Sequence, residues 1–213
     1  MRRRFRVCLS ASCAILLSAL AAAAPTPAAR RVVVVSPGAE DPRIARVGEA
    51  IEFWRDVFAE LGLAEPLVEG GVLVQPAGAR ALENFAWQIS RLAGRLPEGS
   101  DGPSPPPELL AIDGDVVVLL SVQPLLSFTR PLPAPGRYVV AIAAARESAP
   151  DSHPDRNVVA HELGHVLGLR HGNDPTALMC EPCPIVEGGL DAPFRPLTAA
   201  DRERLVELHG RAP

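Results

Sequence analysis

The chain has no lysine, a single tyrosine and only two tryptophans among its 213 residues. All 21 basic residues are therefore arginines, and they face 25 acidic residues for a formal net charge of −4. Residues 1–24 hold four of the arginines and no acid, so removing them leaves 17 arginines against 25 acids and a charge of −8. No arginine cluster remains in the rest of the chain. The charge therefore gives no reason to expect a nucleic acid or an anionic lipid surface as a partner.

Residues 1–24 have the pattern of an export signal. An arginine-rich start is followed by an apolar stretch at 7–20 and by small residues at 21–24 that suit cleavage. The alternative is an uncleaved anchor, because residues 7–24 just reach the length of a membrane span. The small residues and the proline-containing stretch that follows favour cleavage. We therefore expect a secreted or periplasmic protein, with residues 25–213 as one domain and no stable membrane insertion after cleavage.

Cysteine is scarce as well, with four residues in the whole chain. Two lie in the expected signal, which leaves Cys180 and Cys183. In an oxidising compartment these two can bond only with each other, unless a second chain is involved. A C-x-x-C pair in a cytosolic chain would instead suggest redox work or a zinc site. Because Pro182 and Pro184 argue against the strand-to-helix setting of a thiol oxidoreductase, we favour a local disulfide.

The apolar pattern predicts an α+β fold. Apolar residues at three- and four-residue spacing between Ile44 and Leu61 predict a helix with Trp54 and Phe58 in the core. Short β-branched runs predict strands, and proline-rich stretches predict irregular chain at 98–107 and 124–135. We expect strands at 31–35, 68–74, 115–121 and 137–143, and helices at 44–61, 81–96 and 199–209.

Three of the five histidines lie between His161 and His171. His161 and His165 are four residues apart, so a helix places them on the same face. Gly168 is expected to end that helix in a left-handed conformation and to turn the chain back, which brings His171 to the other two. Three histidine nitrogens with a fourth position left for water are the ligand set of a catalytic zinc ion. Glu162 is placed to reach such a water rather than the metal.

The pattern H-E-x-x-H-x-x-G-x-x-H, followed closely by Met179, resembles the metzincin zinc peptidases, and most of all their matrixin branch. The resemblance implies a zinc endopeptidase that acts on protein or peptide substrates. It implies one Zn²⁺ ion on His161, His165 and His171, with Glu162 as general base and Met179 as an apolar floor. It also implies a twisted mixed sheet packed on an N-terminal helix and on the zinc-binding helix, plus a C-terminal helix.

The specific match covers residues 161–179. In metzincins the strand that corresponds to 137–143 forms an edge beside the cleft, where an extended peptide can add as a further strand. The wall of the adjoining specificity pocket is expected from 180–190. Related families place a tyrosine where this chain has Glu181, so no tyrosine switch is expected there. Without an upstream cysteine in the mature chain, we expect no latency by a cysteine switch.

Several residues near the motif keep two interpretations. Asp174 either bonds a ligand histidine or shapes its own turn. The stretch with Asp151, His153 and Asp155 is either a second metal site or, as we favour, a solvated loop; nothing in the sequence supports a Ca²⁺ ion. His209 is expected at the end of the last helix rather than on the metal. For the helix starts, we expect caps from Asn157 before the zinc helix and Thr198 before the last helix.

The competing function is a secreted, zinc-stabilised binding domain without catalysis. Its mark would be the loss of Glu162, which is present. We therefore favour the enzyme, acting as a monomer.

Overall fold

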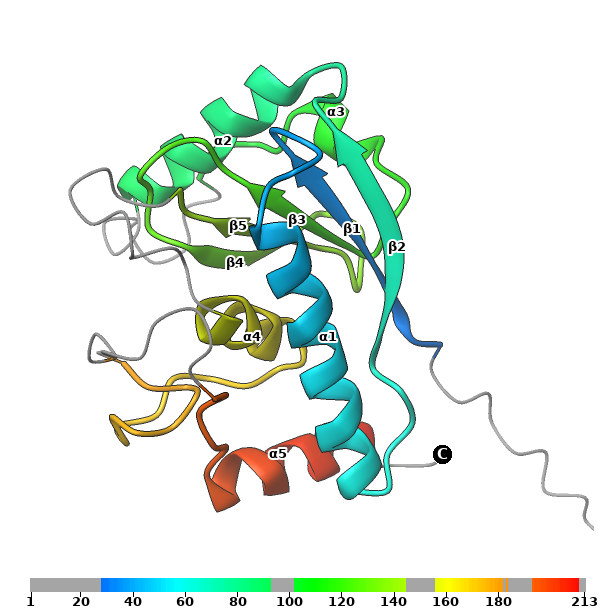
Figure 1. Ribbon diagram of the computed structural model, residues 1–213, viewed down its shortest axis with the longest axis vertical. Coiled ribbons are helices and arrows are strands. Elements are labelled where there is room, and N and C mark those ends of the chain that lie inside the picture. Colours follow the sequence, from blue (N-terminus) through cyan, green and yellow to red (C-terminus); the bar gives the residue numbers. More distant parts are fainter. Residues whose placement is uncertain (1–27, 93–101, 145–155, 182, 184–192, 211–213) are drawn as a thin grey trace, which may run out of the picture.

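The computed structural model describes residues 28–92, 102–144, 156–181, 183 and 193–210. Within them, one five-stranded sheet separates two groups of helices (Figure 1). The strand order is β2-β1-β3-β5-β4, and each neighbouring pair is parallel except β4 with β5. The strands are β1 (Arg30–Ser36), β2 (Leu67–Val74), β3 (Val116–Leu120), β4 (Phe128–Pro131) and β5 (Tyr138–Ile142). The helices are α1 (Arg43–Glu60), α2 (Ala79–Leu92), α3 (Pro107–Leu110), α4 (Arg156–Val166) and α5 (Ala199–His209).

Helices cover both faces of the sheet, and the central strand is accordingly apolar throughout. All five residues of β3 are buried, which is typical of a parallel strand inside a sheet. Successive residues of a strand point to opposite faces. Val118 and Val140 thus belong to the core shared with α1 and α4, whereas Val117 and Val139 belong to the core shared with α2. The predicted α+β fold, with its mixed sheet on an N-terminal and a histidine-bearing helix, is confirmed.

Helices α1 and α4 pack against each other on one face of the sheet, and α5 lies across the lower end of α1 (Figure 1). Trp54 of α1 is fully buried, and its indole N–H donates to the backbone oxygen of Ala160 in α4 at 3.0 Å. His209 ends α5 with its Nε2 2.9 Å from the backbone oxygen of Leu167 and its ring against Phe58. His209 therefore lies at the end of the last helix, as expected. Side chains from α1 and α5 thus bond to the backbone of α4 and of the residue that follows it.

Strand β4 corrects the prediction for the edge of the sheet. It lies inside the stretch 124–135, which was predicted to be irregular, and it occupies the end of the strand order. The expected edge, 137–143, becomes β5, which lies between β3 and β4. The four residues of β4 are half-buried or exposed and end in Pro131. Proline is tolerated on an edge strand, but it hides the strand from a pattern that looks for β-branched runs.

The helix ends agree with the sequence in part. Thr198 caps α5 and forms a capping box with Asp201, as predicted for the cap. Asn157 does not cap α4, because it lies within the first turn, and its side-chain oxygen accepts from the backbone N–H of Arg195 at 2.7 Å. In α5, Leu205 is fully buried, whereas Leu208 is 42% exposed. Asn157 thus ties the segment before α5 to the histidine-bearing helix.

The two tryptophans provide a direct test of the α1–α4 packing. Replacing Trp54 by Ala should lower the free energy of unfolding by about 3–5 kcal/mol, because it removes a fully buried ring. Trp87, which is 44% exposed on α2, is the matched control, and its Ala variant should change stability by less than about 1 kcal/mol. Urea unfolding followed by circular dichroism measures both. Equal losses in the two variants would contradict this packing.

Candidate metal centre

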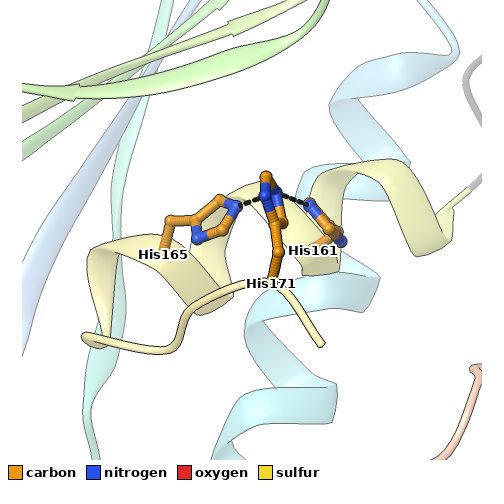
Figure 2. Close-up of side chains that lie close together, drawn as sticks. All are labelled: His161, His165 and His171. Carbon is orange, nitrogen blue, oxygen red and sulfur yellow. Dashed lines mark hydrogen bonds between the residues drawn. The ribbon is translucent and has the colours of Figure 1, made fainter. Parts of the chain in front are cut away.

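The structure brings the side chains of His161, His165 and His171 together on one side of α4 (Figure 2). The first two project from α4, and the third comes from the segment after the helix. Gly168 makes that return possible with a φ of +92°, the left-handed conformation predicted for it. The Nε2 atom of His171 lies 2.9 Å from that of His165 and 3.2 Å from that of His161. The potential ligand atoms of the three residues all lie within 4.8 Å of one another.

The Nδ1 atom on the other edge of each ring has an acceptor of its own. A carbonyl or carboxylate oxygen can only accept, so each Nδ1 must carry the ring proton. In a neutral imidazole the Nε2 atom then offers a bare lone pair. The acceptors are the backbone oxygen of Leu178 for His161 at 2.8 Å, the backbone oxygen of Leu169 for His165 at 3.0 Å, and the carboxylate of Glu181 for His171.

This donor set fits zinc. The dashed contacts in Figure 2 join nitrogens whose lone pairs face one another, an arrangement that a cation stabilises. Zn–N bonds of about 2.0–2.1 Å at tetrahedral angles place ligand nitrogens about 3.3 Å apart, close to the separations of 2.9 and 3.2 Å found here. Burial lowers the pKa of His161 and of His165, which favours the neutral form that binds a metal. The three histidines could therefore hold one zinc ion.

Met179, the expected floor of the site, is 1% exposed. Two backbone hydrogen bonds join the chain around Met179 to Gly172. The N–H of Gly172 donates to the oxygen of Met179 at 2.6 Å, and the N–H of Glu181 donates to the oxygen of Gly172 at 3.1 Å. Below it lies Gly164 of α4. A Cβ atom at Gly164 would come within 2.6 Å of the Met179 sulfur and 3.1 Å of Trp54. The absence of a side chain at Gly164 is thus required for Met179 to lie where it does.

Glu162 follows His161 in α4 and is 6% exposed. The hydroxyl of Thr129 in β4 lies 2.8 Å from its Oε2 and 2.7 Å from its backbone oxygen. Burial raises the pKa of Glu162 to about 7, and the bond from Thr129 acts in the opposite direction. A carboxyl with a pKa near neutrality can take up and release a proton under ordinary conditions.

The remaining predicted residues are placed as follows. Cys180 and Cys183 form a disulfide, as expected. The carboxylate of Asp174 accepts from the N–H and the hydroxyl of Thr176 at 2.9 and 2.7 Å, and these bonds lower the pKa of Asp174. Of the two interpretations of Asp174, the contacts therefore favour the one in which it shapes its own turn. The expected signal at 1–24, the stretch 146–155 with Asp151, His153 and Asp155, and most of the expected pocket wall at 180–190 lie outside the described residues.

Three residues that contact the site were not identified from the sequence: Gly164, Thr129 and Glu181. Gly164 stands inside the motif at a position that the pattern leaves open. Thr129 lies on the strand that the pattern missed. Glu181 was noted only because a tyrosine is absent there. A glutamate two residues after the methionine is the one signal that could have suggested a partner for a histidine.

One comparison with known proteins concerns the segment that contains this site. The family model described as Matrixin matches residues 143–210, the part that contains α4, Met179 and α5. This segment is matrixin-like. The match confirms the resemblance drawn from the sequence, to a metzincin-like zinc metallopeptidase. No curated protein matches the chain at a significant level.

Three solved structures are similar to the chain at low identity. Archaemetzincin from Methanopyrus kandleri is 19% identical, with a TM-score of 0.44 over 88% of this chain and 99% of that one. A zinc-dependent peptidase from Methanocorpusculum labreanum is 17% identical, with a TM-score of 0.38 over 82% and 99%. Metalloproteinase-II from Bacteroides fragilis is 14% identical, with a TM-score of 0.44 over 88% and 55%. These likenesses are too weak to add to the assignment of the matrixin-like segment, which depends on the family match.

The contact under Met179 predicts the effect of a methyl group. Gly164→Ala should cost about 1–3 kcal/mol of stability, because the new Cβ atom forces Met179 and Trp54 to move. Gly48 in α1 is the matched control, since a Cβ atom there meets nothing closer than 3.5 Å. Gly48→Ala should stabilise the helix by about 0.4–1 kcal/mol. Urea unfolding compares the two. A Gly164→Ala protein as stable as the wild type would show that the floor does not need a glycine.

The raised pKa of Glu162 predicts a pH-dependent stability cost. A carboxyl with a pKa of about 7 in the folded chain and 4.5 as its ordinary value stabilises folding below pH 4.5 and loses that contribution as the pH rises through 7. Glu162→Gln cannot ionise. In metal-free protein its stability relative to the wild type should therefore rise by on the order of 3 kcal/mol between pH 4.5 and 8. Denaturant unfolding across this range measures the difference, and a flat difference would contradict the burial argument.

Proposed function

We propose that the chain is an exported zinc endopeptidase that cleaves extended segments of proteins or peptides. The observation that carries the proposal is the convergence of three histidine Nε2 atoms from a segment that also contains the buried carboxyl group of Glu162. The matrixin match over the same residues supports it. The proposed ligands are His161, His165 and His171, with Glu162 as general base and Met179 as the apolar floor.

The proposed chemistry divides between the ion and the chain. His161, His165 and His171 would hold the zinc ion, which would supply Lewis acidity toward a substrate carbonyl and a water molecule. Glu162 takes the proton of the attacking water and returns it to the leaving amine. The burial of Glu162 favours the return of the proton to the leaving amine, because it makes the protonated form of Glu162 accessible near neutral pH. Thr129 holds one carboxylate oxygen on the side of β4.

The proposed substrate strand lies along β4. Among the described residues this strand ends the sheet order, and the end strand of a sheet is where a further strand can add. Its Thr129 contacts Glu162, so a peptide paired with β4 would pass beside the histidines. Main-chain pairing gives affinity with little regard to side chains, which explains why an extended or unfolded chain is the proposed substrate. β4 thereby takes the place that the sequence assigned to 137–143.

Export is the proposed localisation. It rests on the signal-like residues 1–24 and on the disulfide between Cys180 and Cys183, which is stable in an oxidising compartment. Within the described ranges, no helix has both the length and the apolar character needed to cross a bilayer. The proposed mature protein is residues 25–213, as a single domain and a monomer.

Metal analysis joined to a peptidase assay tests the proposal. The wild-type protein should retain one zinc ion per chain and cleave unfolded protein substrates. His171→Ala removes one ligand and should lose the metal. Glu162→Ala keeps all three ligands, so it should retain zinc and the fold while activity falls by at least about 100-fold.

Three results would contradict the proposal in different ways. Full activity in Glu162→Ala would remove the proposed general base. Zinc binding without cleavage of any substrate in a broad peptide library would favour the zinc-stabilised binding domain instead. A His171→Ala protein with undiminished zinc would show that the ligand set is wrong.

A further inference from the structure

The three histidines differ in what holds the far edge of their rings. Backbone oxygens accept from the Nδ1 atoms of His161 and His165, and both rings project from the rigid helix α4. His171 lies outside the helix, its side chain is 41% exposed, and its Nδ1 contacts the carboxylate of Glu181. Within the described residues, Glu181 is thus the only charged partner of a site histidine. The one site histidine outside the helix is thus the one with a charged partner.

Glu181 is itself held in a fixed position. Its N–H donates to the oxygen of Gly172 at 3.1 Å, directly next to His171 in the chain. Gly172 also forms a bridge with Cys180, which is 2% exposed. The disulfide from Cys180 to Cys183 closes a short loop that contains Glu181. The carboxylate therefore reaches His171 from an anchored backbone, and little chain entropy opposes the contact.

We propose that Glu181 is a positioning residue for the metal site: it fixes the tautomer and orientation of His171 and so strengthens zinc binding. The inference rests on the proposed zinc function. Glu181 is not itself a ligand, because it contacts Nδ1, on the ring edge away from the Nε2 atoms that converge. A carboxylate on a ligand histidine also makes the imidazole a stronger donor to the metal, and losing such a partner typically weakens metal binding by about 10–100-fold.

An ordinary surface ion pair is the competing interpretation, and it makes a different prediction. Glu181 and His171 are 64% and 41% exposed, and exposed pairs contribute little to folding stability. If the contact is only a surface ion pair, removing it should change neither the folding stability nor the zinc affinity measurably. If it positions His171, zinc affinity should fall while the stability of the metal-free chain stays the same.

The test measures zinc affinity of the full mature chain by competition with a chromophoric chelator. Glu181→Ala should bind zinc at least about 10-fold more weakly than the wild type. Glu181→Gln still accepts the Nδ1 hydrogen but lacks the charge, so its affinity should lie between the two. Glu65→Ala is the matched control: Glu65 is 43% exposed and pairs with Arg55 at 2.8 Å, and neither residue lines the cavity beside His171. It should bind zinc as the wild type does.

Cobalt substitution and unfolding curves complete the test. The visible absorption of the Co²⁺-loaded protein should change in Glu181→Ala and be closer to the wild type in Glu181→Gln, because the spectrum reports the ligand geometry. Wild-type affinity and spectrum in a folded Glu181→Ala protein would overturn the inference. If that variant fails to fold, Glu181→Gln decides: an affinity equal to that of the wild type overturns the inference, and a reduced one supports it. A folded wild type that binds no zinc would instead overturn the proposed function.

Discussion

The contact between Gly164 and Met179 is the constraint on which the site depends. Because Gly164 has no Cβ atom, Met179 can approach α4 until its sulfur fills the space that a methyl group would take. The main chain around Met179 is thereby fixed against the helix. The preceding carbonyl, that of Leu178, accepts from His161, and the carbonyl of Met179 accepts from Gly172. One close approach therefore orients a histidine of the helix and positions the segment that contains the third.

The electrostatics of the site work against the stability of the fold. A buried carboxyl and two half-buried imidazoles lie within five successive residues of α4, and burial favours the neutral form of each. Neutral imidazoles suit a metal site, and a carboxyl that is easily protonated suits proton transfer. The carboxyl of Glu162 costs stability as the pH rises, because it then ionises where burial disfavours its charge. Such a cost is typical of residues kept for chemistry rather than for packing.

The predicted and the missed features differ in their range along the chain. Local patterns predicted α1 and α5, the capping role of Thr198 and the left-handed turn at Gly168, because each depends on residues within a few positions. The edge strand β4 was missed, because four half-exposed residues ending in proline carry no apolar period of their own. Their strand structure comes from pairing with β5. The misplaced edge at 137–143 follows from the same omission.

The placing of the histidines on one helix face, the glutamate between them and the turn that returns the chain could all be predicted from the sequence. Helical periodicity and the conformational freedom of glycine are local properties. The tertiary structure alone decided which groups support these residues. Thr129 is 33 residues from Glu162 along the chain and touches it only because β4 packs beside α4. Glu181 meets His171 only because Gly172 and Cys180 run side by side. Contacts of this kind depend on how elements pack, and a pattern in one stretch of chain contains no information about which distant side chain will lie against it.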